Sequence, residues 1–107
     1  MTFNIKQNDT SPAMLATLQD AQGSVIDLTG STIRFHMRTI GSTVVAVDAP
    51  AAIVDPLQGL VRYNWDTDDT AAIGSYQAEF EVTYGDASVE TFPNNGYIRV
   101  EITNDIA

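Results

Sequence analysis

The chain has 107 residues, of which 44% are hydrophobic and 18% charged, a composition that suits one domain with its own hydrophobic core. Fourteen Asp and Glu residues against five Lys and Arg give a formal net charge of −9, which opposes binding to nucleic acids and to anionic membranes. The chain has no cysteine, so its fold cannot depend on disulfides. No segment has the apolar length of a signal peptide or a membrane span, and we expect a protein that is used without Sec-type export.

Alternating apolar and polar residues predict short strands in the first half of the chain, at residues 3–5, 14–18 and 33–38. In the third of these strands Phe35 lies on the inward face. Arg34, His36 and Arg38 share the outward face. The third strand therefore carries the one face of the protein that is predicted to be locally cationic.

The middle of the chain has weaker strand signals, at residues 43–47 and 51–54. Pro50 lies between them and has no N–H group to donate to a ladder, so we expect at least one of these strands at a sheet edge. An edge leaves backbone groups unpaired. These two segments and the N-terminal strand are therefore the predicted places where a partner could add a strand.

The second half contains the clearest pattern, at residues 74–84, where apolar or aromatic residues at even positions alternate with polar residues at odd positions. A strand with Tyr63 and Trp65 facing inward precedes it. Residues 66–74 join the two and predict one capped helical turn. After the pattern, Gly85-Asp86 predicts a hairpin, and further strands are predicted at residues 89–92 and 98–102.

Together these elements predict an all-β fold with a single domain over residues 1–107. We expect an Ig-like antiparallel β-sandwich of seven to nine short strands with at most one short helical turn, because turn signals recur about every ten residues. Tyr76 follows Gly74 by two residues, a layout typical of a tyrosine corner, in which the phenol bonds to the preceding loop. With Tyr76, the residues Trp65, Phe35 and Phe80 are predicted to form the structural core.

Two polar groups are candidates for chemistry, and each has a simpler interpretation. Asp66, Asp68 and Asp69 carry the oxygen ligands that calcium prefers, but the glycine and glutamate of a helix-loop-helix calcium site are missing, so capping of the helical turn is favoured and no cofactor is expected. His36 is the only histidine and is predicted to lie on the surface. Without a cysteine or a Gly-x-Ser-x-Gly motif the chain has no nucleophile and base set, and we expect no enzyme.

The order and spacing of several segments are together fairly specific to one protein family. These segments are residues 5–12, Asp27-Leu28-Thr29-Gly30, and residues 35–38, 59–65, 74–80 and 90–98. In these segments the chain resembles the immunoglobulin-like N-terminal domain of phage baseplate upper proteins. The resemblance covers nearly the whole chain. It implies a structural component of a tailed-phage virion, made in the host cytoplasm, whose partners are other tail or baseplate proteins and which has no catalytic residues.

Larger proteins of the family continue into a fibre or receptor-binding portion, whereas this chain stops at Ala107. We therefore expect an adaptor or accessory subunit of the tail or baseplate that acts through protein–protein contacts, and an oligomer within the virion is left open. The alternative is a host-receptor, carbohydrate-binding or capsid-decoration module on the particle surface. That alternative requires exposed aromatic residues, and Tyr84 and Tyr97, near the ends of loops, are the predicted surface contacts.

Overall fold

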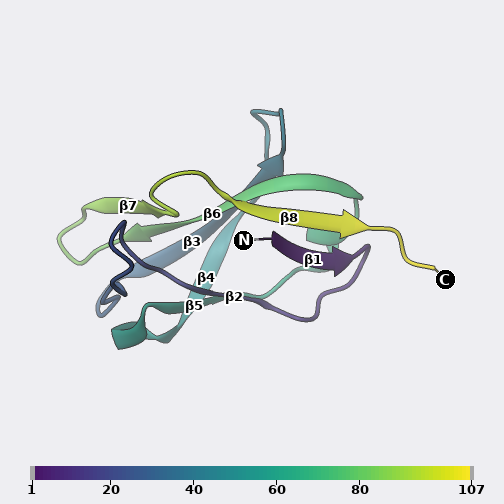
Figure 1. Cartoon of the computed structure of the whole chain (residues 1–107). Coiled ribbons are helices and arrows are strands. Elements are labelled where there is room, and N and C mark those ends of the chain that lie inside the picture. Colours follow the sequence, from purple (N-terminus) through teal and green to yellow (C-terminus); the bar gives the residue numbers. More distant parts are fainter. Residues whose placement is uncertain (1, 107) are drawn as a thin grey trace.

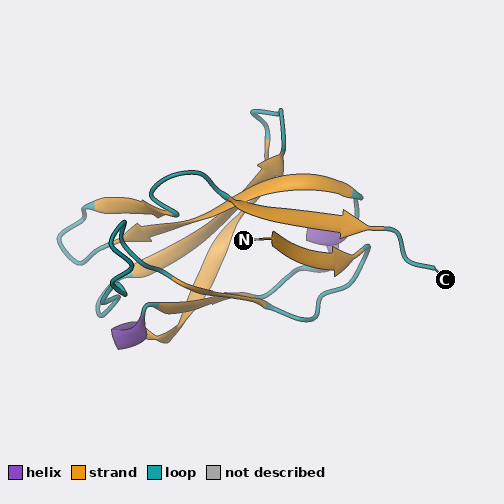
Figure 2. Cartoon of the chain, viewed as in Figure 1, coloured by secondary structure: helices purple, strands orange, loops and turns teal. Residues whose placement is uncertain are grey.

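The computed structural model describes residues 2–106, and these residues form an all-β fold (Figures 1 and 2). The eight strands are β1 (Thr2–Lys6), β2 (Met14–Thr17), β3 (Thr32–Thr39), β4 (Val45–Asp55), β5 (Leu60–Tyr63), β6 (Gly74–Thr83), β7 (Val89–Phe92) and β8 (Ile98–Thr103). Two single 3₁₀ turns accompany them, η1 (Pro56–Gln58) and η2 (Thr67–Thr70). The predicted all-β class is confirmed, while the likeness to immunoglobulin domains stays a prediction.

Strand pairing follows the order β1-β8-β6-β3-β4-β5-β2. β6 is the central strand, because β3 pairs along one side of it while β8 and then β7 pair along the other. β4 joins the two layers of the fold: its residues 45–51 pair with β3 and its residues 52–55 pair with β5. β5 and β2 thereby turn back under the larger layer, and the result is close to a barrel (Figure 1).

The structure differs from the sequence prediction in two places. Residues 43–54 do not form two weak strands, because a single strand of 11 residues, β4, runs through Pro50. Proline is tolerated there since pairing with β5 begins only at Ala52, which leaves one side of the strand without a partner at Pro50. The second difference is that β1 pairs with β8 in parallel; these strands belong to opposite ends of the chain, so no hairpin constrains their direction.

The core is built around Phe35, which is fully buried. Its ring stacks on Tyr63 with a centroid separation of 4.2 Å, and it meets the rings of Phe80 at 5.2 Å and Trp65 at 5.6 Å. The even-numbered residues of β6 are all buried from Tyr76 to Val82, as the alternation predicts. The four residues predicted as structural core therefore lie inside, where aromatic pairs add to the free energy of burial.

Tyr76 forms the contact expected of a tyrosine corner. Its hydroxyl donates a hydrogen bond to the backbone carbonyl of Ala72 over 2.6 Å, and its ring is buried. The bond ties the loop after η2 to the start of β6. It fixes the loop where the chain crosses between the layers.

Replacing Tyr76 with phenylalanine should lower the free energy of unfolding by about 0.5–1.5 kcal/mol, the net contribution of one hydrogen bond, because the ring stays in place. Tyr97→Phe is the matched control, since no described residue hydrogen-bonds to the Tyr97 hydroxyl. Denaturant titrations of the two variants measure the difference. Equal midpoints would show that the corner contributes nothing to stability.

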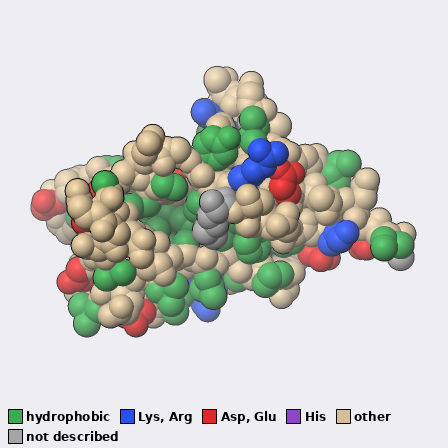
Figure 3. Space-filling view, in the orientation of Figure 1, with side chains coloured by type: hydrophobic (Ala, Val, Ile, Leu, Met, Phe, Trp, Pro, Cys, Tyr) green, Lys and Arg blue, Asp and Glu red, His purple; other side chains and the backbone are tan. Residues whose placement is uncertain are grey.

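Acidic residues outnumber basic ones by fourteen to five in the whole sequence. On the face drawn in Figure 3, both kinds of charged side chain are scattered among apolar and uncharged polar groups. Among the described residues, no helix has the length and apolar character needed to cross a membrane.

Candidate functional site

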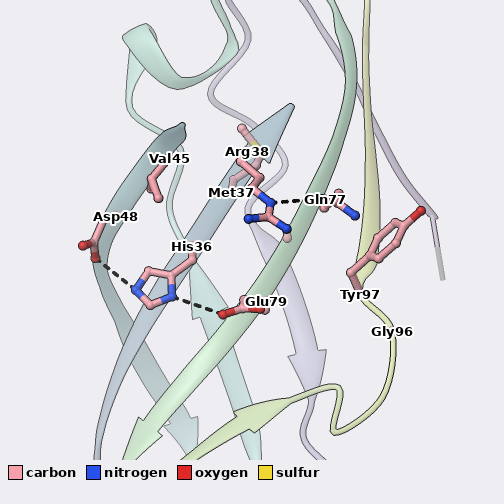
Figure 4. A pocket seen from close by; sticks show the side chains of 10 residues that line it. His36, Met37, Arg38, Val45, Asp48, Gln77, Glu79, Gly96 and Tyr97 are labelled. Carbon is pink, nitrogen blue, oxygen red and sulfur yellow. Dashed lines mark hydrogen bonds and ion pairs between the residues drawn. The ribbon is translucent and has the colours of Figure 1, made fainter. Parts of the chain in front are cut away.

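A pocket of about 400 Å³ lies on the outer face of the larger layer. Its floor is formed by β3 and β6, one wall comes from β4, and the opposite wall comes from the loop before β8 (Figure 4). The side chains on its floor point outward because their neighbours in the alternation, Met37 and Ala78, are buried in the core. The same period of two that builds the core therefore also builds the pocket.

His36 lies at the centre of a row of three directly opposed residues. The strand register pairs His36 with Asp48 of β4 on one side and with Glu79 of β6 on the other. The ring nitrogens follow this register, with Nε2 lying 3.2 Å from Oδ1 of Asp48 and Nδ1 lying 3.4 Å from Oε2 of Glu79 (Figure 4). The side chain is only 23% exposed, so the prediction of a plain surface histidine misses its role as a link between three strands.

Arg34 reinforces this row from the next outward position of β3. Its Nε donates to Oδ1 of Asp48 over 2.7 Å and its Nη2 donates to the Asp48 backbone carbonyl over 2.9 Å. The hydrogen bond from Arg34 holds the pKa of Asp48 below its usual value, with a smaller contribution from His36. Acidic partners thus balance the basic residues, and the outward face of β3 is not the cationic surface that its own sequence predicts.

The opposite side of the pocket combines an amide, a guanidinium and an aromatic ring. Arg38 donates from Nε to the side-chain oxygen of Gln77 over 3.0 Å. Tyr97 stands beyond Gln77 and is 42% exposed (Figure 4). The Tyr97 ring also borders a second hollow of about 250 Å³ toward Phe92 and residues 16–20, so it is well placed for contact with a ligand or partner.

Tyr84, the other predicted surface contact, does not fit that role. Its ring is partly buried against the core, and its hydroxyl donates to Glu90 over 2.7 Å. Burial, with a further contribution from Glu90, raises the pKa of Tyr84 to about 12. Tyr84 is therefore a structural residue of the β6–β7 hairpin.

Burial also raises the pKa of Tyr63 and of Tyr76 above their ordinary value of 10.0. When the folded pKa exceeds the unfolded one, the group stabilises the fold fully below pH 10, and this contribution is lost as the pH rises through the folded value. The free energy of unfolding should therefore fall between pH 10 and 12. Ultraviolet absorbance measures tyrosinate formation, and near-ultraviolet circular dichroism measures loss of the fold; we expect the two changes to occur together. Tyr84→Phe should reduce the decrease in the free energy of unfolding. Complete ionisation of all tyrosines near pH 10 in a folded protein would contradict this expectation.

The three aspartates considered for calcium have a different use. One Oδ2 atom of Asp69 accepts hydrogen bonds from the Tyr63 hydroxyl over 2.5 Å and from the backbone N–H of Asp66 over 2.8 Å. No set of three or more His, Asp and Glu side chains in residues 2–106 is arranged to hold a metal ion. The contacts of Asp66 and Asp69 thus belong to the start of η2, and the weak calcium interpretation stays a prediction.

The pocket is suited to binding. Among the described residues, the pocket lining contains no serine, threonine, cysteine or lysine, and its one side-chain hydroxyl belongs to Tyr97. Sequence reasoning missed Asp48 and Gln77 as site residues. Their outward positions follow from strand alternation, but their meeting with His36 and Arg38 depends on pairing between strands up to 43 residues apart.

Unpaired strand edges form the second feature that could contact a partner. Residues 45–49 of β4 pair only with β3, because β5 joins further along the strand. Just before this edge Val44 is 74% exposed, and Val45 is 55% exposed. β1 and β2 lie at the two ends of the strand order, so each also has a free edge.

Comparison with known protein families shows which family the chain belongs to. The family model described as the BppU N-terminal domain matches residues 2–95. The chain belongs to this family. The BppU N-terminal domain is a structural domain of the phage baseplate, so its place is in the virion. No curated protein matches the chain.

Proposed function

We propose that this BppU-type domain is an adaptor subunit of the phage tail or baseplate, and that it docks on a neighbouring virion protein by accepting a strand at the free edge of β4. The observation that supports the proposal is the one-sided pairing of residues 45–49 beside two exposed valines. An edge strand of this kind offers backbone donors and acceptors in a row.

The composition of the edge also supports this use. The edge begins with the sequence Val44-Val45-Ala46-Val47, which has no charged residue and no glycine. Solitary proteins usually protect an exposed edge with lysine, proline or a charge; the one charged residue within residues 45–49 is Asp48, whose carboxylate is bound by Arg34. Pro50 has no N–H group to offer a partner strand, but it lies beyond the apolar run. The net charge of −9 adds a preference for a partner with a basic surface and opposes pairing between two copies of this chain.

Location is tested by labelling purified phage particles with an antibody against the domain and viewing them by electron microscopy. Label at the tail end agrees with the adaptor. Label over the shell would favour a capsid-decoration module, and particles without label would refute a role in the virion.

The docking edge is tested with the double variant Val44→Lys/Ala46→Lys, because lysine on an edge strand blocks strand addition. Leu57→Lys/Val89→Lys is the control, with the same change in charge at two exposed apolar residues elsewhere. We expect both variants to melt like the wild type, and only the first to fail to enter particles. Normal incorporation of the first variant would exclude this edge as the docking site.

A further inference from the structure

We propose that the pocket between Asp48 and Tyr97 binds a neutral saccharide, as an activity separate from docking at the edge of β4. Tyr97 would stack against the face of a sugar ring, and the polar side chains of the floor would bond to its hydroxyls. The volume of about 400 Å³ falls within the range of small-ligand pockets, and it suits one or two sugar rings.

The polar side chains of the pocket bond to one another but leave some acceptor and some donor atoms unpaired. Among the described residues, Oε1 of Glu79 and Oδ2 of Asp48 have no hydrogen-bond partner, and the same holds for the terminal nitrogens of Arg38 and the amide nitrogen of Gln77. The pocket therefore presents free acceptors from two carboxylates beside free donors from a guanidinium and an amide. A ligand with hydrogen-bond donors and acceptors a few ångströms apart could bond to both kinds of group. Two hydroxyl groups on neighbouring carbon atoms have this arrangement.

The charges argue against an anionic ligand. Asp48 and Glu79 line the pocket together with His36 and Arg38, and an anion would meet these two carboxylates and the field of a chain with charge −9. A cationic ligand would be attracted by that field and repelled where it lies beside Arg38, so a neutral ligand is favoured by the hydrogen-bonding groups and by Tyr97 rather than by charge.

The position of the pocket argues against an extended peptide. Residues 36–38 of β3 pair with β4 on one side and with β6 on the other. Their backbone groups are therefore used within the sheet, and a peptide lying across this face would find no ladder to extend. Only side chains are available for recognition, which suits a compact ligand.

The aromatic wall completes the site. Tyr97 is 42% exposed and has no other ring packed on it among the described aromatic pairs. In Figure 4 its ring stands across the floor from Val45 and Asp48. An exposed tyrosine at the border of a polar pocket offers an apolar face and a polar tip to the same ligand.

The test is ligand-observed NMR with neutral di- and trisaccharides built from glucose, galactose, mannose, rhamnose and N-acetylhexosamines, each at about 10 mM so that a Kd near 1 mM is still detected. We expect saturation transfer from the protein to at least one of these sugars. Tyr97→Ala and Glu79→Gln should each weaken binding about tenfold or more, while Tyr97→Phe should retain most of it.

Glu81→Gln is the control, because Glu81 shares the strand and face of Glu79 but does not line the pocket. The Val44→Lys/Ala46→Lys variant should bind the sugar normally, so that docking and saccharide binding can fail independently. No transfer to any sugar of the panel would overturn the proposal. So would binding that survives both Tyr97→Ala and Glu79→Gln, or binding that Glu81→Gln weakens as much as Glu79→Gln does.

Discussion

Replacing Trp65 with alanine should lower the free energy of unfolding by about 3–5 kcal/mol, the cost of a large cavity in a packed core. Trp65 is 5% exposed, and its ring contacts those of Phe3, Phe35 and Tyr63 at centroid separations of 5.3–5.7 Å. In a domain of this size each kcal/mol lowers Tm by about 4–8 °C. Thermal and denaturant unfolding of the variant measure the effect, and a Tm within a few degrees of the wild type would contradict this account of the core.

Trp65→Phe separates the ring from its polar atom. The Nε1 atom of Trp65 is buried and has no hydrogen-bond partner among the described residues. An unsatisfied buried donor costs about 1–3 kcal/mol, and phenylalanine removes that donor while it keeps an aromatic ring. The variant should therefore lose less than half as much stability as Trp65→Ala. An equal loss in the two variants would mean that the indole N–H is satisfied in solution.

The second large effect is expected at Gly59. Its backbone has φ of +64°, and a Cβ placed there would lie 2.8 Å from the carbonyl oxygen of Leu18 and 2.9 Å from that of Ile26. These backbone atoms cannot move freely, because Leu18 donates its N–H to the Gly59 carbonyl and accepts a hydrogen bond from Ile26. Gly59→Ala should cost roughly 2–5 kcal/mol, the sum of left-handed strain and overpacking.

Gly41→Ala is the matched control for the crowding. Gly41 has φ of +87°, but a Cβ there would meet nothing within 4 Å. Its substitution should cost only the backbone strain of about 1–2 kcal/mol. Denaturant titration of both variants gives the comparison. If the two losses are equal, the close approach of Leu18 and Ile26 to Gly59 does not limit the fold.

The proposed docking edge and the proposed saccharide pocket are neighbours that share β4. Asp48 lines the pocket and lies within residues 45–49 of the free edge. Its side chain and its carbonyl are both held by Arg34. A partner strand on this edge would therefore lie beside the pocket without covering its floor, which belongs to β3 and β6.

Local patterns in the sequence determined much of this protein. The alternation in residues 74–84 predicted the buried face of β6. The spacing of Gly74 and Tyr76 predicted a bond from the phenol to the preceding loop, and the structure identifies the acceptor as the Ala72 carbonyl. Both are decided by neighbours along the chain, since alternation follows from the pleat of a strand and the corner spans four residues. The predicted core residues lie inside for the same reason.

Only the tertiary structure decided which side chains meet on the outer faces of the sheet. The two strands predicted within residues 43–54 became one strand, β4, because β3 and β5 flank different parts of it. His36 became a link between strands when the register brought Asp48 and Glu79 to its sides. Strand order and register depend on which distant segments pair, and one residue type on a strand carries no signal of its neighbour across the sheet. The sequence therefore determined which side chains face inward, whereas pairing between distant strands determined which outward side chains meet.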